Sequence, residues 1–148
     1  MVLNTLRKLF KRDLQKLATE ITSYKSEGAL WAIKGDILNS GGTLCLHLIG
    51  NLNAYIGAEL GNTGYKRQRE KEFSQRDVPK AELLREIGKT QKMVDHTLDC
   101  LDEGVLEEEY PLLVFREKMT TGYFLIHLAT HLTYHLGQIN YHRRLLDS

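Results

Sequence analysis

The stretch Thr120–Leu146, TTGYFLIHLATHLTYHLGQINYHRRLL, decides the fold of this chain. It contains no proline and no acidic residue, so it is predicted to form one uninterrupted helix of about seven turns. Four of the six histidines of the chain lie on it. His127, His131 and His135 follow one another at intervals of four, so successive rings are rotated by only about 40° around the helix.

A seam on this helix has the spacings of a buried heptad face. It consists of Phe124, Leu128, His131, His135 and His142. Two histidines one turn apart, His131 and His135, therefore stand where packing would favour Leu or Ile. A polar ring in a core costs about 1–3 kcal/mol unless a partner satisfies it, so the pair is predicted to share a partner.

Length and charge limit the class of protein. The chain has 148 residues, the usual size of one domain, and residues 1–148 are predicted to form a single domain. Its 20 Lys and Arg nearly balance its 19 Asp and Glu, which argues against nucleic acid as the main partner. Only two prolines occur, which suits a mostly helical chain.

Targeting signals are not evident in the sequence. The N-terminus, MVLNTLRKLFKRDL, carries charge throughout and does not resemble a signal peptide. No apolar run approaches the roughly eighteen residues of a membrane span. The two cysteines, Cys45 and Cys100, fall inside predicted helices, where reduced and buried thiols are expected. We therefore expect a cytoplasmic protein with no membrane partner.

The rest of the chain predicts three more amphipathic helices and two long connections. The predicted helices span 3–26, 43–60, 79–102 and 120–146, which favours an all-α four-helix bundle. Residues 61–79 are too many for a simple hairpin, so this crossover is expected to run back along the bundle and make the second and third helices parallel. Residues 103–119 form the other connection, and Tyr110–Phe115 is expected to be an extended strap on the bundle.

The second helix brings a histidine to the bundle interior. His47, Asn51, Ala54 and Ala58 form a strip of polar or small residues. Gly50 and Gly57, seven apart, predict close helix packing within or between subunits. If the 61–79 crossover runs back, its far end, Phe73 to Asp77, arrives near His47, and Arg76 would meet an anionic ligand there. The alternative is that this charged loop is only solvated.

A metal site follows from combining the histidines. His131 and His135 present two imidazoles to one point, and His47 from a facing helix would complete three ligands. Three neutral nitrogens leave an open position on Zn²⁺ or a similar ion. The sequence contains neither H-E-x-x-H nor Glu-x-x-His, which argues against a zincin or di-iron site. Cys45 points about 160° away from His47, which argues against a cysteine nucleophile.

Two segments together resemble a known family. LCLHLIGNLNAYIG at 44–57 and HLATHLTYHLGQINYHRRLL at 127–146 resemble the DinB-like superfamily of damage-inducible, metal-binding four-helix bundles, in an uncharacterised branch related to bacillithiol and mycothiol S-transferases. The resemblance implies that His47, His131 and His135 bind one divalent ion (zinc, nickel or iron). It also implies an up-down-down-up bundle, a homodimer, a low-molecular-weight thiol partner and a small electrophilic substrate.

The sequence also departs from the family pattern. Tyr134 stands where the family often has another histidine, and His127 is an additional histidine one turn earlier. Neither departure removes a ligand, but both leave the substrate unassigned.

Three functional hypotheses follow. The first is a metal-dependent thiol transferase, or a related hydrolase or isomerase. In it Arg76 would hold a substrate carboxylate, Trp31 and Tyr134 would wall the pocket, and Asn51 or Gln138 would orient a ligand imidazole or a bound water. Alternatively, Trp31 is a hydrophobic plug at the end of the bundle.

The second hypothesis is a non-catalytic dimeric bundle that binds a metal or a small ligand. The third is a metal-free bundle whose core histidines are satisfied by Asn51, Gln138 and backbone groups. An open coordination position, and not the fold, separates an enzyme from a binding protein.

Overall fold

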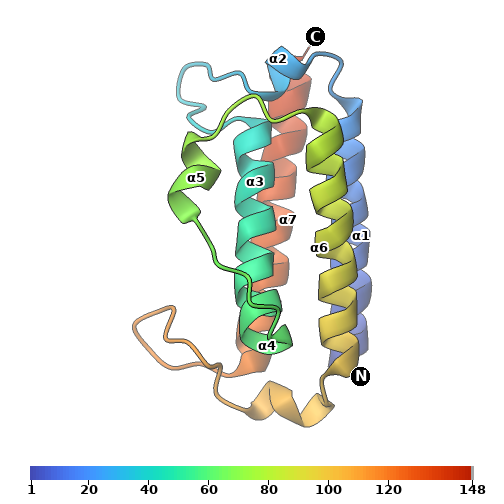
Figure 1. Ribbon diagram of the computed structural model, residues 1–148, viewed down its shortest axis with the longest axis vertical. Coiled ribbons are helices and arrows are strands. Elements are labelled where there is room, and N and C mark those ends of the chain that lie inside the picture. Colours follow the sequence, from blue (N-terminus) through green and yellow to red (C-terminus); the bar gives the residue numbers. More distant parts are fainter. Residues whose placement is uncertain (148) are drawn as a thin grey trace.

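The computed structural model describes residues 1–147 and shows a bundle of long helices with short helical segments around it (Figure 1). In Figure 1 the first and last long helices run upward and the two central ones downward, so the up-down-down-up order is confirmed. The long helices are α1 (Val2–Ser23), α3 (Gly41–Leu52), α6 (Lys80–Cys100) and α7 (Thr121–Leu146).

Shorter helical segments continue or connect these helices. Helix α3 passes into a π-helix, η1 (Asn53–Ala58), and then into α4 (Glu59–Gly61). The loop that leads into α3 contains α2 (Glu27–Leu30), and the last connection contains a 3₁₀ helix, η2 (Glu103–Glu107).

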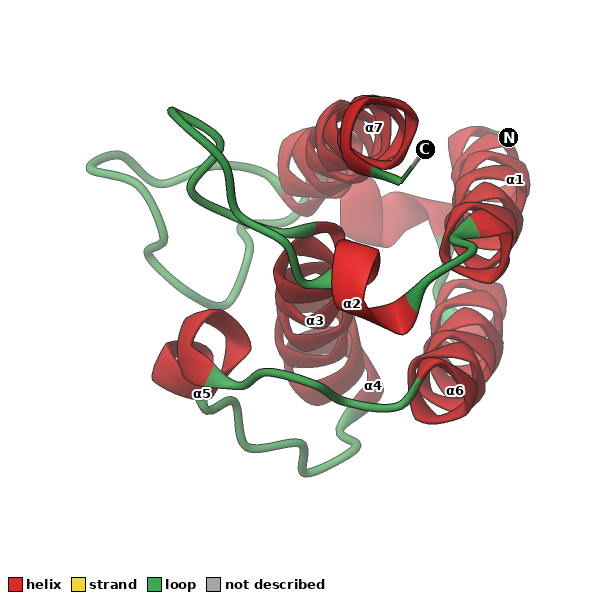
Figure 2. Ribbon diagram, turned by 90° about the horizontal axis from the view of Figure 1, so that it is seen from above, coloured by secondary structure: helices red, strands yellow, loops and turns green. Residues whose placement is uncertain are grey.

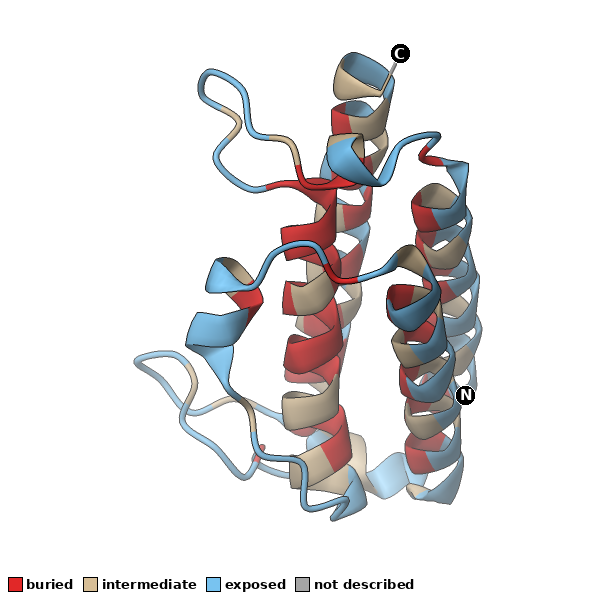
Figure 3. Ribbon diagram, turned by 45° about the horizontal axis from the view of Figure 1, so that its top comes forward, coloured by how far each residue is buried: buried red, intermediate tan, exposed pale blue. Residues whose placement is uncertain are grey.

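The crossover returns along α3 to the start of α6, as predicted, and carries a short helix, α5 (Arg69–Ser74). Seen from above, α5 lies outside α3, away from the other long helices (Figure 2). Almost every residue of α3 is buried as a result (Figure 3).

The buried stripe of α7 differs from the predicted seam. Leu132 and Leu136 face the core, while His131 and His135 are only half-buried beside them. The continuous leucine stripe offers more apolar area than a stripe containing two histidines, so it takes the core position. The histidines are thereby turned toward α3 and α5.

The other long helices bury stripes of ordinary helical period. In α6 the apolar residues Leu83, Ile87, Val94 and Leu98 are buried, together with Thr90 and Thr97. At the end of the second long helix, Ile56 is fully buried and Tyr55 is not. The wider turn of η1 changes the helical period there, which a heptad pattern does not anticipate.

Trp31 closes the end of the bundle, as the plug reading predicts. It is buried, and a Cβ on Gly42 would lie 2.6 Å from its ring, so position 42 in the first turn of α3 requires a glycine.

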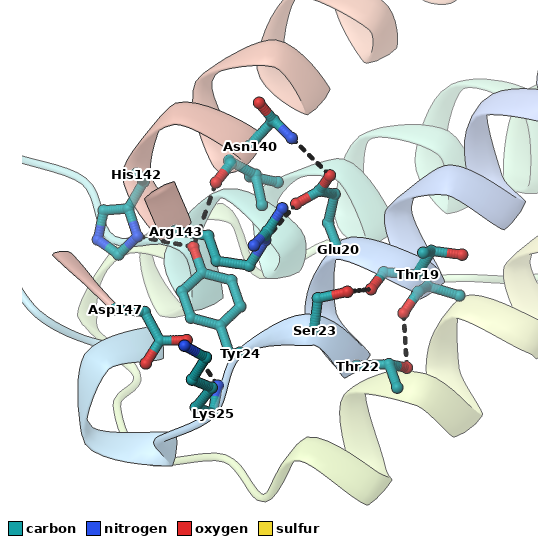
Figure 4. A network of polar contacts seen from close by, with 12 residues as sticks. Thr19, Glu20, Thr22, Ser23, Tyr24, Lys25, Asn140, His142, Arg143 and Asp147 are labelled. Atoms are coloured by element: carbon teal, nitrogen blue, oxygen red, sulfur yellow. Dashed lines mark hydrogen bonds and ion pairs between the residues drawn. The ribbon is translucent and has the colours of Figure 1, made fainter. Parts of the chain in front are cut away.

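Near Trp31, His142 is a core histidine whose two ring nitrogens both have hydrogen-bond partners (Figure 4). Its Nε2–H donates to the carbonyl of Ala32 at 2.8 Å, so its Nδ1 accepts from the hydroxyl of Tyr24 at 2.7 Å.

Glycines and cysteines show where close packing occurs. Gly50 faces the carboxyl group of Glu72 and Gly57 faces Met93, so both close contacts are made within the chain, not at a dimer face. Cys45 is buried, which raises the pKa of its thiol to about 12. Cys100 is exposed at the end of α6, so the prediction that it is buried was wrong.

The last connection is a protruding loop instead of a strap. Its ends pair, because the N–H of Tyr110 donates to the carbonyl of Met119 at 2.9 Å. Tyr110 is buried against Phe124, with ring centroids 4.5 Å apart, but Leu113 and Phe115 remain exposed. Of the predicted Tyr110–Phe115 strap, Tyr110 is therefore part of the core and Val114 packs partly buried against it.

A buried carboxylate joins the first and last helices. Asp13 is 3% exposed and accepts hydrogen bonds from Thr133 Oγ1 at 2.6 Å and Arg12 Nε at 2.8 Å. Burial alone would raise the pKa of Asp13, but these two donors outweigh it and lower the pKa.

Within the described residues, no helix has the length and hydropathy needed to cross a bilayer.

Candidate metal centre

Three histidines from two helices meet at one point. His47 of α3 and His131 and His135 of α7 each offer a ring nitrogen, and these atoms all lie within 4.8 Å of one another. The Nε2 atoms of His47 and His131 are 3.3 Å apart. The ring of His135 lies edge-on to the other two rings, with centroids 5.2 Å from His47 and 4.5 Å from His131.

A carboxylate from the crossover fixes the orientation of His47. Glu72, on α5, is buried, and its Oε1 lies 3.1 Å from Nδ1 of His47. Burial would raise the pKa of Glu72, but hydrogen bonds from His47 and Arg67 outweigh it and lower the pKa. Because an ionised carboxylate only accepts, His47 carries its proton on Nδ1 and its Nε2 lone pair faces the other histidines.

Glu72 is itself fixed by Arg67 and by the shape of the α3 surface. Arg67 binds both carboxylate oxygens, through Nε and Nη2, each at 2.9 Å. Such a bidentate pair restricts the carboxylate in plane and direction. Gly50 on α3 leaves the space that the carboxylate occupies, and the ring of Phe73 packs on His47 with centroids 5.0 Å apart.

His135 is oriented by its neighbour one turn along α7. Nδ1–H of His135 donates a hydrogen bond to Oε1 of Gln138 at 2.6 Å, which leaves the lone pair of Nε2 free. Burial lowers the pKa of His135, although the bond to Gln138 acts in the opposite direction. A neutral ring with a fixed tautomer is the form in which histidine binds a metal.

His131 is the least satisfied member of the cluster. Its Nδ1 is buried and has no hydrogen-bond partner. Burial and the neighbouring His135 and His47 lower the pKa of His131 to about 4, so it is neutral near pH 7. Without a metal, its Nε2–H must donate to the Nε2 lone pair of His47, which leaves Nδ1 as an unpaired buried acceptor.

The cluster fits a divalent metal ion. Two nitrogens about 2.0–2.1 Å from a tetrahedral ion are about 3.3–3.4 Å apart, which matches the separation of the Nε2 atoms of His47 and His131. Metal binding through Nε2 would also place the proton of His131 on Nδ1. Within residues 1–147, no carboxylate or thiol joins the three histidines as a fourth ligand.

The other predicted site residues have varied positions. Gln138 contacts a cluster histidine as proposed, and its Nε2 lies 3.4 Å from the hydroxyl of the exposed Tyr134. Asn51 is buried, but its Oδ1 has no partner. Arg76 donates to the backbone carbonyls of Phe73 and Gln75 at the end of α5 and makes no contact with the cluster among its described hydrogen bonds.

The remaining histidines lie outside the triad. His127 stacks on Phe124, with centroids 5.8 Å apart, and lies one turn below His131. His96 is exposed on α6.

Sequence reasoning missed Arg67 and Glu72. They lie in a connection, where no helical period selects residues that face the core. One signal was present: REKEFS, residues 69–74, lacks Gly and Pro and has a single aromatic residue, Phe73, which is typical of a short helix anchored on an apolar surface.

The fold and this cluster define a helical-bundle protein with a three-histidine candidate metal site. The chain belongs to the family described as "Protein of unknown function (DUF1572)", whose match covers residues 1–148. No curated protein and no solved structure matches the chain significantly.

Proposed function

We propose that His47, His131 and His135 bind one divalent metal ion through their Nε2 atoms, and that the protein is a metal-dependent enzyme of the thiol-transferase type. The convergence of three ring nitrogens within 4.8 Å of one another is the observation that supports the metal most directly. His142, by contrast, uses both of its ring nitrogens in hydrogen bonds within the bundle, as a purely structural histidine does.

The ion is inferred to be zinc, nickel or iron, because imidazole suits all three. With three protein ligands such an ion keeps a coordination position free, where it lowers the pKa of a water or a thiol. The thiol-transferase assignment rests on the resemblance to DinB-like S-transferases. The homodimer and the low-molecular-weight thiol remain predictions.

The side chains around the cluster would prepare it for this ion. Glu72 and Gln138 hold two imidazoles in the ligating tautomer before any ion arrives, which reduces the reorganisation that binding requires. Phe73 covers one face of His47 and excludes water from it.

Elemental analysis of protein purified without chelator tests the proposal. About one divalent ion per chain is expected in the wild type, and none in a His131→Ala/His135→Ala variant. His96→Ala is the matched control, since it removes an exposed histidine far from the cluster. If the wild type takes up neither Zn²⁺, Ni²⁺ nor Fe²⁺, or if His96→Ala loses as much metal as the double variant, the assignment fails.

Catalysis is tested separately. The metal-loaded protein is incubated with bacillithiol or mycothiol and an electrophilic dye, and thiol conjugation is followed against the double variant. Metal binding without any turnover would favour the non-catalytic alternative.

A further inference from the structure

A cavity of about 620 Å³ opens beside the histidine cluster, between residues 36–39 and the second half of α7. His135 and its partner Gln138 line it. A molecule in this cavity would therefore contact the cluster.

The walls of this cavity, here called the His135 cavity, are more apolar than polar, with Asn39 and Gln138 among the polar groups. Leu38, Leu44 and Leu145 contribute aliphatic groups, and Tyr134 and Tyr141 contribute rings. Leu38 is 72% exposed and Leu145 63% exposed, although both are large apolar side chains. Exposed apolar side chains gathered around a concave site are typical of a surface that a ligand covers.

The charge of the lining excludes one class of ligand. Asp36 is the acidic residue of the lining, and no lysine or arginine lines the cavity within the described residues. Arg144 stacks on the Tyr141 ring at 5.1 Å, but it is not part of the lining. His142 offers no free ring nitrogen, because Tyr24 and Ala32 occupy both. In the metal-free protein, on which the selection is measured, an anion would lose its hydration here without gaining a cationic partner.

We propose that the His135 cavity binds an uncharged, largely apolar small molecule, and that it selects against anionic molecules of the same shape. The assignment of this cavity as the electrophile-binding site of a metal enzyme rests on the proposed function. The selection of neutral over anionic ligands does not require a metal. The cavity would hold the electrophile beside the metal ligand His135.

A matched pair of fluorescent probes tests this selection. N-phenyl-1-naphthylamine is neutral, and 8-anilinonaphthalene-1-sulfonate has the same aromatic body with an added sulfonate. The neutral probe is expected to bind about ten-fold more tightly than the sulfonate. Equal affinities, or tighter binding of the sulfonate, would overturn the selection. The absence of saturable binding of the neutral probe would overturn the site itself.

Three variants locate the bound probe. Leu38→Asp and Leu145→Asp place a charge on an exposed wall of the cavity and are each expected to weaken binding of the neutral probe by about five-fold. Ile126→Asp is the control, since Ile126 is 50% exposed in a different apolar groove, of about 550 Å³, between α1 and α7. It should change the affinity by less than about two-fold. The reverse pattern would place the probe in that groove and refute the assignment.

Metal content measured on the same samples separates the two proposals. Probe binding that follows the expected pattern in metal-free protein, together with no metal uptake, would refute the metal site and leave the cavity assignment intact. Metal uptake without probe binding would refute the cavity assignment alone.

Discussion

Replacing Glu72 with glutamine tests how the crossover controls the metal site. The carboxylate accepts from Nδ1 of His47 and from two nitrogens of Arg67, whereas an amide of the same shape has a single acceptor oxygen. Glu72→Gln therefore cannot satisfy all three donors. With its amide oxygen at the Oε1 position it loses the bond from Nε of Arg67, and with its amide nitrogen there it loses the bonds from His47 and from Nη2 of Arg67.

The expected loss can be estimated from these contacts. Partners that orient a ligand histidine are typically worth about 10–100-fold in metal affinity, or about 1.4–2.8 kcal/mol. The metal-free protein should also lose about 2–3 kcal/mol of unfolding free energy, because a hydrogen bond between charged groups is broken in a buried site. Both effects come from the same carboxylate, so they should appear together.

Zinc affinity is measured by competition with a chromophoric chelator near neutral pH, and unfolding free energy by urea denaturation of the metal-free protein. Glu70→Gln is the control, because Glu70 is exposed on the same short helix and this substitution removes the same charge. In addition, ¹⁵N NMR of the wild type should show His47 protonated on Nδ1, and the variant should show a mixture of tautomers. If a helical Glu72→Gln protein binds zinc as tightly as Glu70→Gln does, the charge of the Glu72 carboxylate does not support His47 as a ligand.

Three further predictions concern other parts of the chain. Gly50→Ala should displace the carboxylate of Glu72 and weaken zinc binding about as much as Glu72→Gln. The control is Gly88→Ala on α6, where the glycine has open space around it, and it should leave zinc binding unchanged and stabilise the fold by about 0.5–1 kcal/mol. Equal zinc affinities for the two variants would contradict the packing argument. Asp13 has a lowered pKa when folded, so its stabilising effect is complete above its unfolded pKa of about 3.9 and is lost as the pH falls through the folded value. Asp13→Asn should therefore lower the urea midpoint at neutral pH and approach the wild type as the pH falls through the folded pKa of Asp13. An undiminished difference in acid would count against the linkage. Tyr24→Phe removes the donor to His142 and should cost about 1–2 kcal/mol in thermal unfolding without a change in zinc affinity, so a loss of zinc binding would show that this contact reaches the cluster.

Helical periodicity was enough to predict the long helices and which histidines face one another across them. The four long helices and the parallel crossover follow from apolar spacing and link length, and the meeting of His47 with His131 and His135 follows from facing positions on two of those helices. The prediction placed the two α7 histidines in the core itself, because a spacing pattern does not compare the apolar area of neighbouring stripes. The leucines beside the two histidines have more apolar area and are therefore the residues that are buried.

The parts that could not be predicted depend on contacts between distant segments. The sequence of 61–79 contains several basic residues, and nothing local separates Arg67, which binds Glu72, from Arg76, which binds backbone carbonyls at the end of α5. The choice is made by the space that Gly50 leaves on α3. The roles of Arg67 and Arg76 are therefore determined by the surface against which the crossover packs.

The π-helix η1 gives this protein an unusual tolerance to a change in chain length. Deleting a residue inside an α-helix rotates everything downstream by about 100°, which normally separates an apolar face from its partner. Residues Asn53–Ala58 already form a widened turn, so shortening it by one residue would restore the ordinary α-helical turn and keep both flanks in phase. A codon deletion within this segment is therefore expected to preserve the fold, whereas the same deletion between Leu44 and Leu52 would rotate His47 out of the cluster.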